Sequence, residues 1–336
     1  LLNRSSDLIA HAREKNIPIR MDDELFVSLL PKGVKVIGVT GTRGKTTTTS
    51  LIYHVLKKAG KRVHLGGNIR GVATLALLPK VKTGDYVVLE LSSWQLQGFG
   101  ESKIAPNVSV FTNFMSDHMN YYKNDLTAYF ADKAFIFTYQ KVGDVLVAGD
   151  ALVKKIPKAY KGTIVAAQAV DVPSVWKLKI PGEHNRANAA CALAALRALK
   201  IPLAKIRSGM ESFVSVEGRL QYVKTLRGVA IYNDNNATTP EATIAALTAF
   251  PKKQTVLIMG GADKGLDMSA LVETAREYAN TVILLPGSGS DRISDPEFYR
   301  ASSLKDAVET AVHSADKGDT VCRQNEQLFR RRPSVM

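Results

Sequence analysis

The chain has 336 residues, enough for two domains and part of a third. Hydrophobic residues make up 45% of it and charged residues 23%, which is the composition of a globular protein and excludes a largely disordered one. The net charge of +14 favours acidic partners, but the basic residues are spread out and match no zinc-finger, RNP or helix-turn-helix pattern. Small polyanions such as nucleotides are therefore favoured over nucleic acid.

The sequence shows no sign of membrane insertion or export. No apolar run reaches the roughly 20 residues of a membrane helix, and the start has no signal-peptide pattern. Two cysteines, Cys191 and Cys322, are too few for a disulfide framework and indicate a cytoplasmic protein. Because the chain opens on Leu1 without a Met, we expect a fragment of a longer protein.

Helices and strands are predicted to alternate along the first part of the chain. Residues 7–15 predict a helix, followed by a short strand and a second helix that ends near Leu30. Residues 34–40 form an apolar, β-branched run typical of a buried strand, and the helix after the next loop ends at residues 57–60. Further strands are expected at residues 86–91, 108–112 and 145–148, and further helices at 126–137 and 185–199.

A second alternating unit is expected from residue 215 onward. Its strands are predicted at residues 229–232, 255–259 and 281–285, and its helices at 240–249, 269–278 and 303–313. Such alternation predicts the α/β class, with mostly parallel sheets and ligand sites at the carboxyl ends of strands. We expect a P-loop-type central domain and a Rossmann-like C-terminal domain.

The segment Gly41-Thr42-Arg43-Gly44-Lys45-Thr46 stands between the first buried strand and an amphipathic helix. Backbone N–H groups of such a turn, together with the helix N-terminus, can hold phosphate. Lys45 would meet the terminal phosphates, and the Thr46 hydroxyl would reach a magnesium ion. A solvated turn is the alternative, but the threonine run 46–49 at a helix start favours a nucleotide loop.

Polar residues also close the neighbouring strands. Glu90 ends one of them, where a metal–nucleotide complex needs a hard oxygen ligand, although an ordinary strand-end glutamate fits equally well. Asp117-His118 follows the next strand, and Lys133 lies on the helix after it. By themselves these last residues favour a loop histidine and a solvated lysine.

Three later segments add candidates for ligand binding. Asn185 is a natural helix N-cap, whereas Asn188, one turn further on, is not explained by that cap. In the second unit Arg219 precedes a strand that closes at residues 233–238, and the following strand closes at residues 260–265. An anionic ligand at these strand ends would meet Thr238 and Lys264.

Taken in this order, the motifs resemble the Mur ligase family of peptidoglycan biosynthesis from about residue 5 to Val321. The segment Glu90-Leu91-Ser92-Ser93-Trp94-Gln95-Leu96 is most similar to the members that add D-glutamate, and Gly67-Asn68-Ile69 to the loop that touches the muramyl substrate. The resemblance implies a cytoplasmic, monomeric ligase that joins D-glutamate to UDP-N-acetylmuramoyl-L-alanine through an acyl phosphate. It implies ATP and two Mg²⁺ ions as cofactors, with no nucleic acid and no membrane insertion.

The resemblance also implies a role for each matching residue. ATP binding falls on Gly41, Thr42, Gly44, Lys45, Thr46, Thr47, Asn185, Asn188, Arg219 and Asp234. Magnesium binding falls on Thr46, Glu90, His118 and a carbamoylated Lys133, and catalysis on Lys45, Lys133 and His118. Substrate binding falls on Asn68, Ser92, Thr238 and Lys264.

The family pattern predicts three regions. Residues 1–30 would be the remnant of an N-terminal UDP-binding domain, 31–214 the central ATP-binding domain, and 215–336 the C-terminal amino-acid-binding domain. Arg43 stands where the family usually has Asn, and Asn235-Asn236 where it usually has Ser-Lys. After residue 321 the family's Ser-Pro loop and Phe are missing, so we expect an aberrant end. The alternatives are another Mur or folylpolyglutamate-type ligase, or an inactive ATP-binding fragment.

Overall fold

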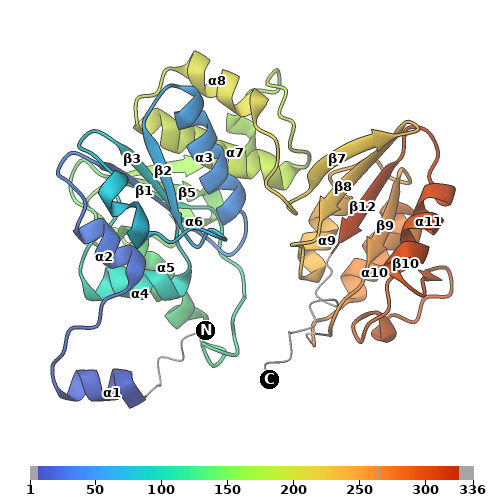
Figure 1. The fold of residues 1–336 in the computed structure, drawn as a ribbon, viewed down its shortest axis with the longest axis horizontal. Coiled ribbons are helices and arrows are strands. Elements are labelled where there is room, and N and C mark those ends of the chain that lie inside the picture. The colour runs from blue at the N-terminus through green and yellow to red at the C-terminus, as the bar shows by residue number, and fades with distance from the viewer. Residues whose placement is uncertain (1–6, 264, 325–336) are drawn as a thin grey trace. The chain divides into compact units, whose positions relative to one another are not determined.

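The computed structural model describes residues 7–263 and 265–324 (Figure 1). The chain divides into two compact units. The first unit reaches to Trp176 and includes Ala187–Met210, and the second consists of Lys177–Arg186 and the chain from Glu211 onward. Within the described ranges no helix has the length and apolar character needed to cross a membrane.

The first unit is built on a six-stranded parallel sheet with the order β2-β3-β1-β4-β5-β6. The strands are β1 (Lys35–Thr40), β2 (Val63–Gly67), β3 (Tyr86–Glu90), β4 (Val108–Phe111), β5 (Val145–Gly149) and β6 (Thr163–Ala167). The three central strands are buried almost along their whole length, which explains their continuous apolar sequences. Because β1 lies between β3 and β4, the loops that follow these three strands emerge side by side at one edge of the sheet.

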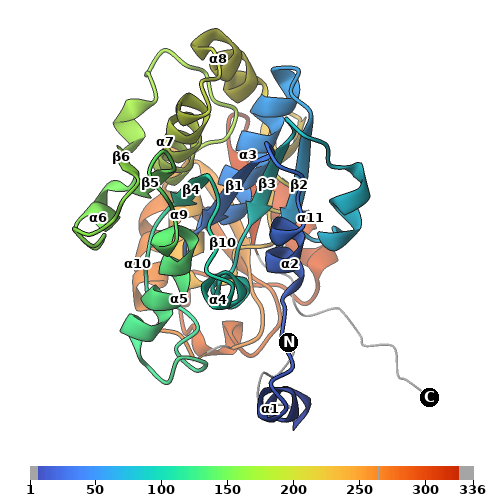
Figure 2. The ribbon, with the colours of Figure 1, turned by 90° about the vertical axis from the view of Figure 1, so that its left-hand side faces the viewer.

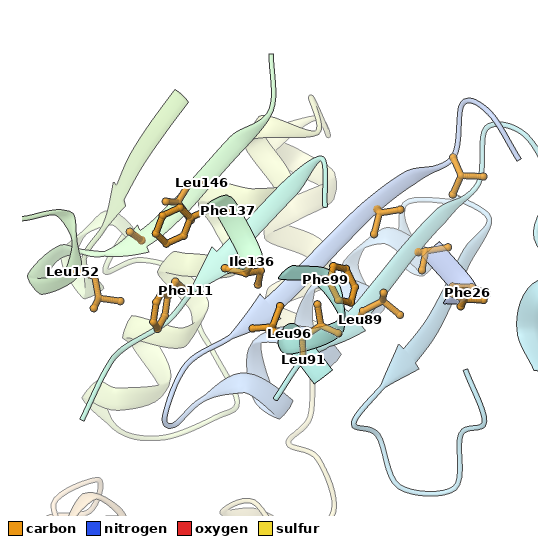
Figure 3. Close-up of a cluster of buried hydrophobic side chains, with 14 of the residues drawn as sticks. Phe26, Leu89, Leu91, Leu96, Phe99, Phe111, Ile136, Phe137, Leu146 and Leu152 are labelled. Carbon is orange, nitrogen blue, oxygen red and sulfur yellow. The ribbon is translucent and has the colours of Figure 1, made fainter. Parts of the chain in front are cut away.

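Helices cover both faces of this sheet (Figure 2). The helices α2 (Asp22–Ser28), α4 (Ser93–Glu101) and α5 (Leu126–Thr138) lie on one face, and α3 (Lys45–Lys58), α7 (Glu183–Ala198) and α8 (Leu203–Ser212) on the other. The first face encloses a hydrophobic cluster in which Phe26, Leu96, Phe99 and Ile136 from the helices pack against strand residues such as Leu89 (Figure 3). The other helical segments are α1 (Asp7–Glu14), η1 (Leu75–Lys80), α6 (Asp150–Val153) and η2 (Ala169–Asp171).

The second unit has a six-stranded sheet with the order β11-β10-β9-β12-β8-β7, parallel except for the β7–β8 pair. Its strands are β7 (Gln221–Leu226), β8 (Val229–Asp234), β9 (Thr255–Met259), β10 (Ala279–Leu284), β11 (Tyr299–Arg300) and β12 (Thr320–Gln324). The helices α9 (Pro240–Leu247) and α10 (Ser269–Tyr278) pack on one face, α11 (Leu304–Ser314) packs on the other, and η3 (Ser290–Arg292) follows β10. The predicted α/β class with mostly parallel sheets is confirmed in both units.

Two expectations about the elements were wrong or incomplete. No strand forms between α1 and α2, where Pro18 lacks the N–H that a strand needs. The strand β12 continues through Cys322, Arg323 and Gln324 in register with β8, so the change of composition after Val321 does not end the strand. The rest of the expected aberrant end, residues 325–336, lies outside the described residues.

Candidate active site

The glycine-rich loop leaves the carboxyl end of β1 and enters α3. At its start the backbone of Gly41 has a φ of +146°, and a Cβ there would lie 2.0 Å from Thr112 Oγ1. At its end Gly44, the N-cap of α3, has a φ of +77°, and a Cβ there would lie 2.0 Å from Asn188 Oδ1. Neither position has room for a side chain, which is why the sequence needs glycine at both.

The loop is held from the neighbouring strand by two residues that the sequence analysis missed. The backbone N–H of Thr42 donates to the Asn113 carbonyl (2.9 Å), and that of Arg43 donates to Asn113 Oδ1 (2.8 Å). Thr112 Oγ1 donates to the Arg43 carbonyl (2.6 Å). Both residues directly follow β4, and their polar character at a strand's carboxyl end was the signal that could have identified them.

Two lysine amines meet on one backbone carbonyl of the loop. Lys45 Nζ donates to the Gly41 carbonyl (3.0 Å) and to the Thr42 carbonyl (3.1 Å). Lys133 Nζ, from α5, donates to the same Gly41 carbonyl (3.0 Å) and lies 4.8 Å from the centre of the Tyr129 ring. Two amines thus meet where α3 begins, and a helix N-terminus together with basic side chains is the arrangement that binds phosphate.

Lys133 is 2% exposed, so the simple expectation of a solvated helix residue was wrong. Burial, together with the charge of Lys45 and against the opposing effect of Asp117 and Asp132, lowers the pKa of its amine from 10.5 to about 7. A large fraction of this amine is therefore neutral near pH 7, and neutral amines are the nucleophilic form.

Glu90 ends β3 next to the loop, because it is paired with Val39 of β1. Its side chain is 2% exposed. Oε1 accepts a hydrogen bond from Asn68 Nδ2 (3.2 Å), whereas Oε2 has no partner among the described residues. The Asn68 N–H also donates to the Glu90 carbonyl (2.8 Å). A buried carboxylate oxygen without a partner is costly, and a cation would satisfy it.

His118 is held beside the loop by an aromatic contact and a charged neighbour. Its ring lies 4.7 Å from the Trp94 ring, edge to face, and its backbone has a φ of +58°. Asp117 Oδ2 lies 3.7 Å from the Nη1 of Arg43 in the loop. Partial burial lowers the pKa of His118, and the charges of Lys133, Lys45 and Arg43 lower it further against Asp117. The imidazole is thereby kept in the neutral form that binds metals.

These residues also allow a test of the expected magnesium site. Among the residues that the structure describes, no three His, Cys, Asp or Glu side chains form a metal-binding group. Glu90 and His118 would need the Thr46 hydroxyl and a carbamate on Lys133 to complete an oxygen-rich site. The unsatisfied Glu90 Oε2 fits such a cation.

Two other predicted residues have structural roles. Ser92 caps α4: its Oγ accepts from the Gln95 N–H (3.3 Å), while its own N–H donates to Gln95 Oε1 (2.8 Å). Asn185 Nδ2 donates to the Pro181 carbonyl (2.7 Å) and lies in the second unit, whereas Asn188 lies in the first. The roles of Ser92 in substrate binding and of both asparagines in ATP binding stay predictions.

In the second unit Arg219 and Asp234 are joined through the segment that connects them. Arg219 Nη1 donates to the Asn236 carbonyl (3.0 Å). Asp234 is 7% exposed and accepts from the Leu220 N–H (2.8 Å) and from Gln324 Nε2 (3.1 Å). Burial raises the pKa of Asp234 to about 6, although these two bonds and the charge of Arg219 oppose the rise.

A pocket opens at the carboxyl ends of the strands of the second unit. Thr238 lines it, together with Gly260, Gly261 and Asp263 of the loop after β9. Lys264, the other residue predicted to bind the amino acid, lies outside the described residues. The structure thus gathers the loop, Asn68, Glu90, His118, Lys133 and Asn188 in the first unit, and Arg219, Asp234 and Thr238 in the second.

The parallel sheet and the phosphate-type loop before α3 define a P-loop-type nucleotide-binding α/β protein with a Rossmann-like second unit. The sequence matches the Mur ligase middle domain over residues 39–169 and the Mur ligase, glutamate ligase domain over residues 218–323. It is 32% identical to UDP-N-acetylmuramoylalanine–D-glutamate ligase of Acetivibrio thermocellus over 93% of this chain and 73% of the relative. The same enzyme of Clostridium kluyveri is 33% identical, over 94% of this chain and 74% of the relative. The chain belongs to the Mur ligase family.

Solved structures agree on the fold. The MurF ligase from Thermotoga maritima in complex with ADP superimposes with a TM-score of 0.72 at 20% identity, covering 92% of this chain and 79% of that one. A bifunctional folylpolyglutamate synthase/dihydrofolate synthase with Mn, AMPPNP and L-glutamate bound gives a TM-score of 0.66 at 19% identity, covering 96% of each chain. At these identities the likeness defines the fold and leaves the substrate to other arguments.

Proposed function

We propose that this protein is an ATP-dependent ligase that adds D-glutamate to UDP-N-acetylmuramoyl-L-alanine in peptidoglycan biosynthesis. The observation that carries the proposal is the convergence of the Lys45 and Lys133 amines on the Gly41 carbonyl, at the end of the strand that neighbours Glu90, whose Oε2 has no partner among the described residues. Relatives above 30% identity along most of the chain bear the name of that ligase. The names of these relatives support the choice of substrates, and the geometry of the glycine-rich loop supports ATP as the nucleotide.

In the proposed reaction a carboxylate oxygen of the muramyl substrate attacks the γ-phosphorus of ATP, and ADP leaves. The amine of D-glutamate then attacks the acyl phosphate, and inorganic phosphate leaves from a tetrahedral intermediate as the amide forms. Positioning and charge neutralisation dominate such a reaction, since both substrates are anionic. Lys45 would neutralise the transferred phosphoryl group, and the first turn of α3 would hold the neighbouring phosphates.

Magnesium is part of the proposal. The ion would lower the charge of the triphosphate and of the acyl phosphate. Glu90 and Thr46 would hold one ion, and His118 with a carbamoylated Lys133 would hold a second. The low pKa of Lys133 supports the modification, because the neutral amine adds to CO₂, loses a proton and becomes an anionic carbamate.

The localisation and the oligomeric state of the protein are also part of the proposal. The nucleotide-linked substrates and the two buried, unpaired cysteines support a place in the reducing cytoplasm. We expect a monomer, which sedimentation would check.

The experiment that tests the proposal is phosphate release from ATP in the presence of both substrates, in wild type and in Lys45→Ala. We expect the substitution to lower release by at least about a thousandfold, as loss of a transition-state cation does. Lys57→Ala is the matched control, since Lys57 is an exposed lysine near the end of the same helix. Unchanged turnover in Lys45→Ala would refute the assignment of the loop.

The amino acid is tested separately. D-glutamate, L-lysine, L-alanine and, with a folate acceptor, L-glutamate are offered to the wild-type protein, and amide products are identified by mass spectrometry. Product with D-glutamate alone supports the proposal. Product only with another amino acid would identify another ligase of the family, and ATP binding without any amide would identify an inactive fragment.

A further inference from the structure

The pocket of the second unit has a wall to which no role has yet been given. Two of its walls are the segments that carry Thr238 and Asp263, which follow β8 and β9. The third wall follows β10 and includes Gly289, Ser290 and Ile293. We call this third wall the β10 turn, residues 287–293.

The β10 turn is fastened to the loop after β9. The Gly289 N–H donates to the Gly261 carbonyl (3.0 Å), and the Asp263 N–H donates to Ser288 Oγ (3.0 Å). A Cβ on Gly289 would lie 3.0 Å from the Gly261 carbonyl oxygen, so the two backbones touch. A displacement of the β10 turn must therefore move Gly261 and Asp263 of the loop after β9.

Arg292 adds two further bonds to the same loop. Its Nη1 donates to Asp263 Oδ1 (2.7 Å) and to the Leu266 carbonyl (3.1 Å), so one guanidinium group joins two residues of the loop after β9. The side chains of Arg292 and Asp263 are 43% and 38% exposed. An ion pair that is this exposed contributes little to the stability of the fold. We therefore consider its effect on ligand binding in the pocket.

The charges that line the pocket suggest a role for the ion pair between Arg292 and Asp263. Among the described residues that line it, Asp263 has the only acidic side chain, and its negative charge, if no cation offset it, would repel an acidic amino acid. Arg292 neutralises that carboxylate. Beside it Ser290 is 2% exposed, and its hydroxyl has no partner among the described residues, so a hydroxyl donor is available on the same turn.

We propose that Arg292 is a positioning residue that makes this pocket selective for an acidic amino acid, by neutralising Asp263 and holding it in place through the bonds of its guanidinium to Asp263 and to the Leu266 carbonyl. The inference rests on the proposed function, because D-glutamate is the dicarboxylate that the pocket would receive. The selectivity is electrostatic, so it should distinguish D-glutamate from D-glutamine, which has the same shape and no side-chain charge.

The test measures KM and kcat for D-glutamate and D-glutamine, together with KM for ATP, in four proteins: wild type, Arg292→Ala, Asp263→Asn and the double variant. In Arg292→Ala we expect KM for D-glutamate to rise about tenfold and KM for D-glutamine to rise less, with KM for ATP unchanged. In the double variant the preference for D-glutamate should recover, because the side chain at position 263 no longer carries a negative charge. Lys252→Ala is the matched control, since Lys252 forms an exposed ion pair with Glu277 of the same unit outside the pocket.

Each outcome separates the inference from the proposed function. A wild-type protein that binds ATP but uses no D-glutamate would overturn the proposed function. A wild-type protein that uses D-glutamate, with the same preference over D-glutamine in Arg292→Ala, would overturn the inference alone. A merely structural role would lower the melting temperature and raise the KM values for D-glutamate, D-glutamine and ATP alike, and that result would also overturn it.

Discussion

Two glycines of the same helix allow a sharp test of the nucleotide loop. Gly44 begins α3 with a φ of +77°, and Gly60 follows its end with a φ of +79°. They differ in their surroundings, because a Cβ on Gly44 would lie 2.0 Å from Asn188 Oδ1, whereas a Cβ on Gly60 meets nothing within 4 Å. Substituting each by alanine separates backbone strain from the close contact in the site.

The strain is common to both substitutions. Placing an L-residue in the left-handed region costs about 1–2 kcal/mol, so Gly60→Ala should destabilise the fold by that amount and leave ATP binding intact. Gly44→Ala carries the same strain and an overlap with Asn188 that only a shift of about 1 Å in the loop or the carboxamide can relieve. A displacement of that size in a site that works by positioning costs on the order of a hundredfold.

The assay is calorimetric titration with ATP and magnesium, with thermal unfolding measured on the same samples. We expect the melting temperature to fall in both variants, and further in Gly44→Ala because of the overlap, whereas the affinity for ATP should be about a hundredfold lower in Gly44→Ala only. Equal ATP affinity in Gly44→Ala and Gly60→Ala would show that the contact between Asn188 and Gly44 has no part in nucleotide binding.

Two further predictions concern buried charges of the same site. In Glu90→Gln the buried carboxylate, whose Oε2 has no partner among the described residues, becomes a neutral amide. We expect the metal-free protein to keep its melting temperature, while magnesium-dependent ATP binding, measured by calorimetry, weakens at least about tenfold. An unchanged magnesium dependence would contradict this. Lys133 has a pKa of about 7 when folded and 10.5 when unfolded, so the unfolded state binds more protons between these values and stability rises with pH across this range. Between pH 7 and 9.5 the unfolding free energy of the wild type should therefore gain about 3 kcal/mol that Lys133→Met does not gain. Urea unfolding in CO₂-free buffer measures this difference. An equal gain in both proteins would argue against the low pKa of Lys133.

The sequence predicted those strands whose apolar, β-branched runs are buried on both faces. β1, β3, β4 and β9 fall within one residue of their expected ranges, because burial of the central strands leaves a continuous pattern. β2 was missed since it carries a histidine and ends in two glycines, and β7 because it lies at an edge and is largely exposed. These two strands form because they pair with a neighbouring strand, and that pairing cannot be predicted from the local sequence.

The same distinction holds for the site. The phosphate loop was predictable because its glycines, lysine and threonine are contiguous and stand between a strand and a helix. The support of the loop by Asn113, and the contact of Asn188 with Gly44, join residues that are 70 or more positions apart in the sequence. Lys133 was predicted through the family resemblance alone, since its burial depends on tertiary packing around α5.

The charges around Gly41 are unfavourable in the protein as folded and become favourable with the proposed partners. The Lys45 and Lys133 amines share one carbonyl, so two basic groups are close together. Among the described residues nothing pairs with the buried Glu90 Oε2. A carbamate on Lys133 would reverse the sign of one amine and turn its repulsion from Lys45 into attraction. A triphosphate would then neutralise Lys45, and magnesium would satisfy both Glu90 and the carbamate. Lys45, Glu90 and the carbamate would therefore all have partners of opposite charge when an anionic nucleotide and its metal are bound together. This is why we expect the site to bind the nucleotide and the metal together.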